Sequence, residues 1–362
     1  MKTNITILCP ERVKRGGLLY FYSLFPFLRK KYPFVDFYFT NSLDYCLEKD
    51  QNESILIIRY ISNNHKFDDI DTTNILNRLR DKYKNLSLFD DGARTSIDFP
   101  QALPIVDTYF HCQLFRDLSN YRRPVKRGQL YSEYYAQLGI EDKLNYSSVP
   151  VDNQSLPKIQ LAWNIGAGCY PRKNLLRKTG LVVANYISPK ILSYFYTDPQ
   201  NIPPPKNKET YDVQARFSIQ PVPTIAYQRE RVLDIVKNDS RVLTGFISPA
   251  NFNDEISSVK IVISPFGWGE VCFRDFEAVL NGALLLKPDM SHLNTWPDIY
   301  HPYETYVPFQ WDCEDLPDKI DEYLENDQKR KLITTNAYYH YMEELNKLDD
   351  KVESMVELMV KR

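Results

Sequence analysis

The sequence predicts an α/β protein with two doubly wound, Rossmann-like domains that face a cleft. Three observations support this class: the chain length, an alternation of strand-like and helix-like segments, and a break in that alternation near the middle. With 362 residues, the chain is too long for one ordinary core, and it fits two domains of about 150 to 200 residues each. Its 43% hydrophobic and 25% charged residues are typical of a folded globular protein.

Short apolar runs alternate with segments of helical spacing in the first half of the chain. This alternation predicts a parallel sheet that is covered on both faces. The expected strands are residues 5–9, 35–39, 54–61 and 85–89, and the expected helices are residues 18–31, interrupted by Pro26, and 71–83.

The alternation is lost at residues 146–157, where Pro, Ser and Asn accumulate, and we place the domain boundary there. The predicted domains are residues 1–150 and 151–345, followed by a C-terminal helix at 346–362 that can pack back on the first domain. Ligands of such sheets bind beyond the carboxyl ends of the strands, so functional residues are expected in the loops that follow strands. The expected strands of the second half are residues 158–163, 212–218, 242–247, 260–264 and 284–287, and the expected helices are 224–237, 255–259, 329–345 and 351–360.

Charge and cysteine usage exclude several classes of protein. A net charge of −2 argues against a nucleic-acid partner. One basic stretch stands out and indicates a solvated loop, a contact to an anionic membrane surface or a site for an anionic ligand. It contains Arg122, Arg123, Lys126 and Arg127. The six scattered cysteines read as free thiols in a reducing compartment, and the dispersed histidines indicate no zinc site.

The N-terminus has no secretory signal, and no apolar run of about 18 residues is present. These features predict a cytoplasmic protein, with peripheral attachment to a membrane as the alternative.

The most informative stretch is residues 264–292, "SPFGWGEVCFRDFEAVLNGALLLKPDMSH". Gly267 and Gly269 follow an expected strand and allow a ligand to approach the backbone closely. On a helix, Glu270, Arg274 and Glu277 would share one face. A solvated face in which Arg274 bridges two acids would also explain this spacing.

The residue types of this stretch favour a nucleotide-linked ligand. A helix N-terminus presents unpaired N–H groups to an anion. Arg274 supplies a planar fork that suits a diphosphate. Glu277 can accept hydrogen bonds from the two hydroxyls of a ribose, as the acid of a dinucleotide fold does.

Residues 264–312 resemble the donor-binding signature of GT-B glycosyltransferases, particularly the exostosin-like and "glycosyl transferase group 1" branches. The resemblance rests on Arg274-Asp-Phe-Glu277-Ala278, followed by Gly282-Ala283. It implies a GT-B arrangement, with Gly269, Arg274 and Glu277 binding a nucleoside diphosphate sugar. Glu270 resembles the first acid of the paired-glutamate motif of retaining members, at a spacing one residue shorter, and the resemblance makes it a catalytic candidate.

Two loops of the first domain are further candidates. Gly16 and Gly17 follow the first strand, where GT-B enzymes often have a glycine-rich loop that faces the acceptor. Asp90 and Asp91 end a strand, where a carboxylate can act as general base or orient the acceptor. An Asp-Gly turn in which one acid caps the backbone is the equal alternative.

Two loops of the second domain complete the candidate site. Asn164, Arg172 and Lys173 lie in a glycine-containing loop that either binds the donor diphosphate or is a plain surface loop. Asp289 and His292 follow the strand after the key helix and can contact the donor, while a rigid proline-containing loop is the alternative. The D-x-D pattern at 67–71 reads as a helix cap rather than a metal site.

These features together predict a glycosyltransferase that moves a sugar from a nucleoside diphosphate to a glycan acceptor. Charge on the leaving group would be stabilised by Arg274 and the helix N-terminus, without a metal or another cofactor. Two alternatives remain: a nucleotide-sugar epimerase or hydrolase with the same layout, and a carbohydrate-binding protein without catalysis. The sequence specifies neither the sugar and base nor the acceptor and stereochemistry.

Overall fold

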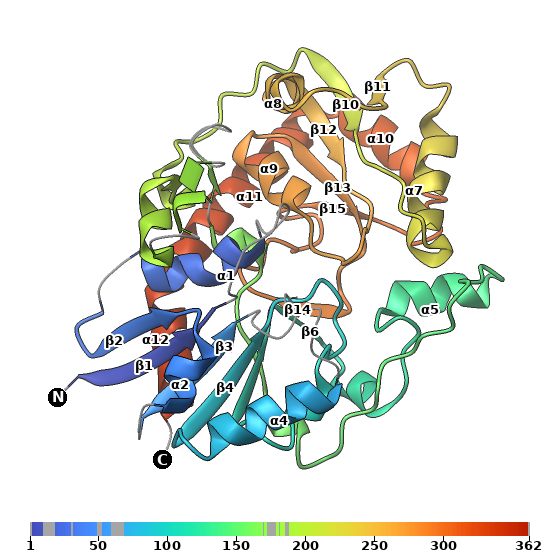
Figure 1. Cartoon of the computed structure of the whole chain (residues 1–362). Helices are drawn as coiled ribbons and strands as arrows, with labels where there is room; N and C mark the ends of the chain where they lie inside the picture. The colour runs from blue at the N-terminus through green and yellow to red at the C-terminus, as the bar shows by residue number, and fades with distance from the viewer. Residues whose placement is uncertain are drawn as a thin grey trace.

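The chain forms two Rossmann-like α/β domains, each built on one parallel sheet (Figure 1). The computed structural model describes residues 2–9, 19–29, 32–48, 53–58, 69–168, 170–171, 179–180, 182–184 and 188–360. The fold class predicted from the sequence is therefore confirmed.

The first sheet has the strand order β2-β1-β3-β4-β5-β7, and all of its neighbouring strands run parallel. Its strands alternate with helices because consecutive parallel strands need a crossover connection. The strands are β1 (Thr3–Leu8), β2 (Val35–Thr40), β3 (Ser54–Ile58), β4 (Asn85–Asp90), β5 (Thr108–His111) and β7 (Ile159–Leu161).

Apolar side chains on both faces of this sheet are covered by helices. One face packs on α2 (Leu43–Glu48) and α4 (Asp69–Arg80). The other packs on α1 (Leu19–Leu28) and on the C-terminal helix α12 (Leu348–Val360), which returns to the first domain (Figure 1).

The second sheet repeats the same winding with the order β11-β10-β12-β13-β15, again all parallel. Helices α7 and α10 cover one face, and α8, α9 and α11 cover the other. The strands are β10 (Tyr211–Ala215), β11 (Val242–Thr244), β12 (Val259–Ile263), β13 (Leu284–Pro288) and β15 (Val307–Phe309). The helices are α7 (Pro223–Val236), α8 (Pro249–Ile256), α9 (Phe273–Leu280), α10 (Leu316–Glu325) and α11 (Asp327–Asn346).

One predicted strand joins a different sheet from the one we expected. Residues 158–163 were expected to open the second domain, but β7 pairs with β5 and extends the first sheet. A strand's own residues do not specify its partner, because every parallel strand offers the same backbone donors and acceptors. The chain therefore crosses to the second sheet after β7.

Two contacts between secondary-structure elements connect the domains. Strand β6 (Gln113–Phe115) follows β5 of the first sheet and pairs antiparallel with β14 (Leu293–Thr295) from the second domain. Helix α5 (Leu130–Gln137) extends from the first domain and packs against α7 of the second (Figure 1). These contacts hold the carboxyl ends of the two sheets toward one another.

Candidate active site

A cavity of about 370 Å³ lies between the two domains, where loops from the carboxyl ends of both sheets meet. This is the position at which doubly wound sheets bind ligands. From the first sheet and its crossover the cavity is lined by Asp91, Gly92, Ala93, Cys112, Gln113, Asn164 and Ile165. From the second domain it is lined by Gln220, Arg229, Gly267, Trp268, Gly269, Val271, Cys272, Phe273, Arg274 and Glu277.

Helix α9 directs its N-terminus to this cavity, because Cys272 and Phe273, at its start, both line the cavity. The start is fixed by Asp275, whose carboxylate accepts a hydrogen bond from the backbone N–H of Cys272 at 2.9 Å. Asp275 is itself anchored by a fully buried ion pair with Lys287 Nζ at 3.0 Å and by the Tyr300 hydroxyl at 2.7 Å. The helix thus presents its N-terminal backbone N–H groups at a defined place.

Two guanidinium groups converge on the cavity and flank one aromatic ring. The guanidinium carbons of Arg229 and Arg274 each lie 5.7 Å from the centre of the Phe217 ring. Arg274 donates from Nη2 to the carbonyl of Arg216 at 2.7 Å, and its buried Nε has no partner among the described residues.

Arg229 is held more tightly than Arg274. Its Nε donates to the carbonyl of Phe266 at 2.6 Å, and its Nη1 donates to that of Ser218 at 2.5 Å. Burial is the main cause that lowers the pKa of Arg229, and the nearby charge of Arg274 lowers it further. An arginine remains charged at neutral pH despite such a shift, so the cavity carries two positive charges suited to a diphosphate.

Glu277 lines the same cavity one helical turn beyond Arg274. Among the residues that the structure describes, none donates a hydrogen bond to its carboxylate. Burial is the main cause that raises the pKa of Glu277, and Asp275 adds to this effect, whereas Arg274 opposes it. A partly buried carboxylate without a protein donor is costly to desolvate, which fits a group that a ligand completes.

The two glycines before α9 serve protein contacts as well as lining the cavity. A Cβ on Gly267 would lie 2.5 Å from Nη2 of Arg229, and a Cβ on Gly269 would overlap the carbonyl oxygen of Ala93. Gly269 is therefore needed for the close approach of the two domains, a role that the sequence did not predict.

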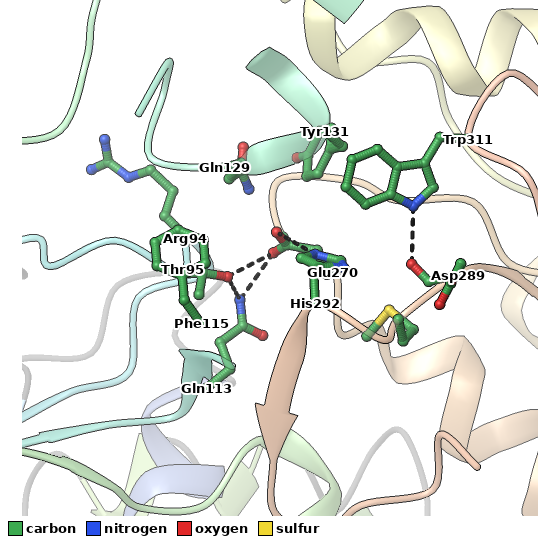
Figure 2. A network of polar contacts seen from close by, with 12 residues as sticks. Arg94, Thr95, Gln113, Phe115, Gln129, Tyr131, Glu270, Asp289, His292 and Trp311 are labelled. Carbon is green, nitrogen blue, oxygen red and sulfur yellow. Dashed lines mark hydrogen bonds and ion pairs between the residues drawn. The ribbon is translucent and has the colours of Figure 1, made fainter. Parts of the chain in front are cut away.

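Glu270 does not share a face with Arg274 and Glu277, contrary to the sequence prediction. Helix α9 begins at Phe273, so Glu270 lies in the preceding loop and is fully buried. Its Oε2 accepts hydrogen bonds from Gln113 Nε2 at 3.0 Å and Thr95 Oγ1 at 3.2 Å, both from the first domain (Figure 2). His292 Nε2 lies 3.7 Å from the other carboxylate oxygen. Glu270 thus joins the domains and does not line the cavity.

The two strand-end acids have different surroundings. Asp90 is buried, and its carboxylate accepts from the Tyr109 hydroxyl at 2.6 Å, Gly92 N at 2.9 Å and Asp98 N at 3.1 Å. This geometry is that of the capping alternative, so Asp90 holds the loop. Asp91 lines the cavity and accepts a hydrogen bond from the Ser23 hydroxyl of α1.

The remaining predicted residues are dispersed. Asn164 lines the cavity, but its side chain caps the turn at Gly166 N, 2.8 Å away, and donates to the Pro297 carbonyl at 3.2 Å. Asp289 lines a separate hollow of about 450 Å³ beside Trp311, and His292 packs against Trp311 at 5.0 Å between ring centres. Gly16, Gly17, Arg172 and Lys173 lie outside the described residues.

The basic stretch at 122–127 is partly neutralised within the protein. Arg123 forms a two-bond pair with Glu133 at 2.7 and 2.8 Å, and Arg127 lies 3.6 Å from Asp142. Lys126 is partly buried, and Arg122 is exposed.

Three further findings concern metals, thiols and membranes. No group of His, Cys, Asp and Glu in the described ranges is arranged to hold a metal ion. No disulfide joins Cys9, Cys46, Cys112, Cys272 and Cys313 to one another, and Cys169 lies outside the described ranges. Within the part of the chain that the structure describes, no helix is both long and apolar enough to cross a membrane.

Sequence reasoning missed two prominent cavity residues. Arg229 lies in the middle of α7, where it reads as an ordinary surface charge, and nothing local marks its burial. Trp268 lies between the two glycines that we had singled out, and its 47% exposure within a cavity wall is unusual for so large an apolar side chain. Its place in that loop was a signal that could have been used.

Comparison with known proteins gives structural similarity only. Neither a family model nor a curated protein sequence matches the chain. Among solved structures, HepE from Anabaena in complex with UDP aligns over 99% of this chain and 100% of its own, with 10% identity and a TM-score of 0.48.

Two further structures cover less of their own length. The pneumococcal O-GlcNAc transferase GtfA in complex with UDP and GlcNAc aligns over 88% of this chain and 60% of its own, with 9% identity and a TM-score of 0.47. TarM aligns over 88% of this chain and 58% of its own, with 11% identity and a TM-score of 0.47. Because these scores are below 0.5, we base the functional proposal on the cavity, and the donor-binding signature stays a prediction.

Proposed function

We propose that the protein is a glycosyltransferase of the GT-B type that uses a nucleoside diphosphate sugar. One observation carries the proposal: Arg229, Arg274 and Glu277 converge, beside the N-terminus of α9, on one cavity between two doubly wound domains. The diphosphate would lie between the guanidinium groups and the helix N-terminus. The ribose hydroxyls would donate to Glu277, whose carboxylate lacks a donor among the described residues.

The same groups would assist the departure of the nucleotide. As the bond from the sugar C1 to the β-phosphate oxygen breaks, the electron pair stays on the diphosphate, and the fixed charges of Arg229 and Arg274 stabilise it. Because these donors are already oriented by the Phe266, Ser218 and Arg216 carbonyls, little reorganisation is needed.

We assign Asp91 as the general base that takes the proton from the acceptor hydroxyl. It follows β4 and lines the cavity, whereas Asp90 is buried within the first domain and does not line the cavity. An acceptor hydroxyl bound beside it would lose its proton to the Asp91 carboxylate while its oxygen bonds to the sugar C1. The acceptor is expected to be a glycan held by first-domain residues.

We further propose that transfer needs no divalent cation, because the cationic side chains of Arg229 and Arg274 and the N-terminus of α9 line the cavity in which the diphosphate would bind. Turnover should persist in a chelator. Loss of turnover in chelator and its recovery with manganese would contradict this part of the proposal.

The proposal is tested in two steps. A thermal-shift panel of nucleoside diphosphates and monophosphates should raise the melting temperature with one diphosphate, because a ligand that binds only the folded state stabilises it. The matching nucleotide sugar is then incubated with and without candidate glycans. Nucleotide release that depends on the glycan identifies a transferase, release without it identifies a hydrolase, and binding without turnover identifies a carbohydrate-binding protein.

A further inference from the structure

The loop that precedes α9 is held along its length by the first domain. We call residues 265–272 the donor loop, because Gly267, Trp268 and Gly269 line the cavity and the loop leads directly into α9. Each residue from Gly267 to Glu270 contacts a first-domain residue through a hydrogen bond or a close backbone approach.

Two of these contacts come from the start of helix α5. The buried Tyr131 hydroxyl donates to the Gly267 carbonyl at 2.7 Å, and Gln129 Nε2 donates to the Trp268 carbonyl at 2.6 Å. Neither side chain lines the cavity. Figure 2 shows both residues on the first-domain segment that passes beside Glu270.

These hydrogen bonds orient the peptide groups of the donor loop. In a trans peptide the C=O and the following N–H point in opposite directions. Since the carbonyls of Gly267 and Trp268 point to α5, the N–H groups of Trp268 and Gly269 point away from it. No described residue accepts a hydrogen bond from either N–H. Successive unpaired N–H groups that point to one side can bind an anion.

The other contacts leave the donor loop little freedom. Gly269 lies directly against the Ala93 carbonyl, and Glu270 is bonded to Gln113 and Thr95. On the second-domain side, Gln228 Oε1 accepts from Phe266 N at 2.8 Å. Both domains therefore hold the donor loop, and the first domain supplies the contacts at Gly267 to Glu270.

We propose that Tyr131 and Gln129 are positioning residues for the donor: they hold the donor loop so that the N–H groups of Trp268 and Gly269 meet the diphosphate. This inference rests on the proposed function of the cavity. The diphosphate site would then depend on both domains: the second domain supplies the donor loop, and the first domain holds it in place. In this proposal Tyr131 and Gln129 do not contact the nucleotide themselves.

The test compares nucleotide binding by the full-length wild type and Tyr131→Phe, using calorimetric titration of UDP and UMP, or of GDP and GMP if the thermal-shift panel favours guanine. Loss of the hydroxyl should weaken diphosphate binding about tenfold, in line with the contribution of one hydrogen bond. Monophosphate binding should change less, so that the preference for the diphosphate falls. Gln129→Met should act in the same direction.

Tyr338→Phe is the matched control, because Tyr338 is also a buried tyrosine that donates to a backbone carbonyl, that of Ile202 at 2.9 Å. It should bind both nucleotides like the wild type. If Tyr131→Phe binds the diphosphate within twofold of the wild type, or weakens both nucleotides equally, the inference is wrong and the proposed function stands. A wild type that binds neither nucleotide overturns both.

Discussion

Individual residues of this protein take their roles from contacts that sequence spacing does not encode. Asp90 and Asp91 are neighbours, yet one accepts three hydrogen bonds inside the first domain and the other lines the cavity. Glu270 fits the spacing of a helical face with Arg274 and Glu277. The helix starts later, however, because Cys272 occupies its N-cap and Asp275 caps the backbone there.

The contrast between the two aspartates gives a direct prediction. Asp91→Asn should lower turnover at least about a hundredfold while leaving nucleotide affinity near wild type, because loss of a general base removes about that much. Asp90→Asn should instead destabilise the fold by about 1–3 kcal/mol, since an amide cannot accept the same three hydrogen bonds. Steady-state kinetics and urea unfolding measure the two effects. Wild-type turnover in Asp91→Asn would exclude it as the base.

Glu277 should make nucleotide affinity dependent on pH. Its pKa is raised by burial, so its carboxylate is protonated at a higher pH than an ordinary glutamate, whose pKa is about 4.3. Nucleotide affinity should therefore begin to fall at a correspondingly higher pH as the solution is acidified. Glu277→Gln cannot titrate at this position, so it should bind the nucleotide weakly at every pH and should not show this fall in affinity. Calorimetric titration of the nucleotide across the acid range compares the wild type with the variant.

The raised pKa of Glu277 also affects the stability of the protein without nucleotide, where the ionised carboxylate is unfavourable. Because the pKa of Glu277 is higher in the folded state than in the unfolded state, the folded protein favours the protonated carboxyl. The resulting stability is fully present below the unfolded-state pKa and is lost as the pH rises through the folded-state pKa. Glu277→Gln should therefore melt at a slightly higher temperature than the wild type at neutral pH, as is common for residues kept for function. A lower melting temperature would indicate that Glu277 stabilises the fold.

At the scale of elements, α9 depends on the buried pair between Asp275 and Lys287. Both side chains are fully buried, and the pair links the start of α9 to β13. Lys287→Met should cost about 3–5 kcal/mol of unfolding free energy, because it leaves a buried carboxylate without its cation. Urea denaturation measures this loss.

Lys260→Met is the matched control for that experiment. Lys260 lies on β12 and pairs with Asp212 at 2.7 Å, but both groups are partly exposed. Such a pair contributes about 1 kcal/mol or less. Equal, small losses in the two variants would show that the buried pair does not anchor α9.

Helices and strands with a regular spacing of apolar residues could be predicted from the sequence, but the elements that they pack against or pair with could not. The apolar runs at 35–39 and 85–89 became β2 and β4, and the helical spacing at 224–237 became α7. Strand β7 was found, yet its pairing with β5 was missed, since the sheet that a strand joins depends on the rest of the chain. The burial of Arg229 was missed for the same reason, because the carbonyls that accept its hydrogen bonds, those of Phe266 and Ser218, come from other segments of the chain.

At the scale of the whole molecule, one of the hydrophobic clusters extends through both domains. A single cluster of buried side chains includes Leu88 of β4 and Val262 of β12, and the β6–β14 pair crosses the boundary. We therefore expect one cooperative unfolding transition in scanning calorimetry, with agreement between calorimetric and van't Hoff enthalpies. Two separated transitions would show that the domains unfold independently and that the contacts between them contribute little to stability.

Glu277 and its neighbours form the nucleotide site that we propose, and one titration tests this site most directly. UDP, or the diphosphate selected by the thermal-shift panel, is titrated into wild type and Glu277→Ala, with circular dichroism confirming that both are folded. Loss of two hydrogen bonds to a carboxylate should cost roughly 2–4 kcal/mol, or about one and a half to three decades in affinity. Helix α9 should persist, because alanine is the best helix former. Equal affinities in two folded proteins would contradict the account and remove the donor from this cavity.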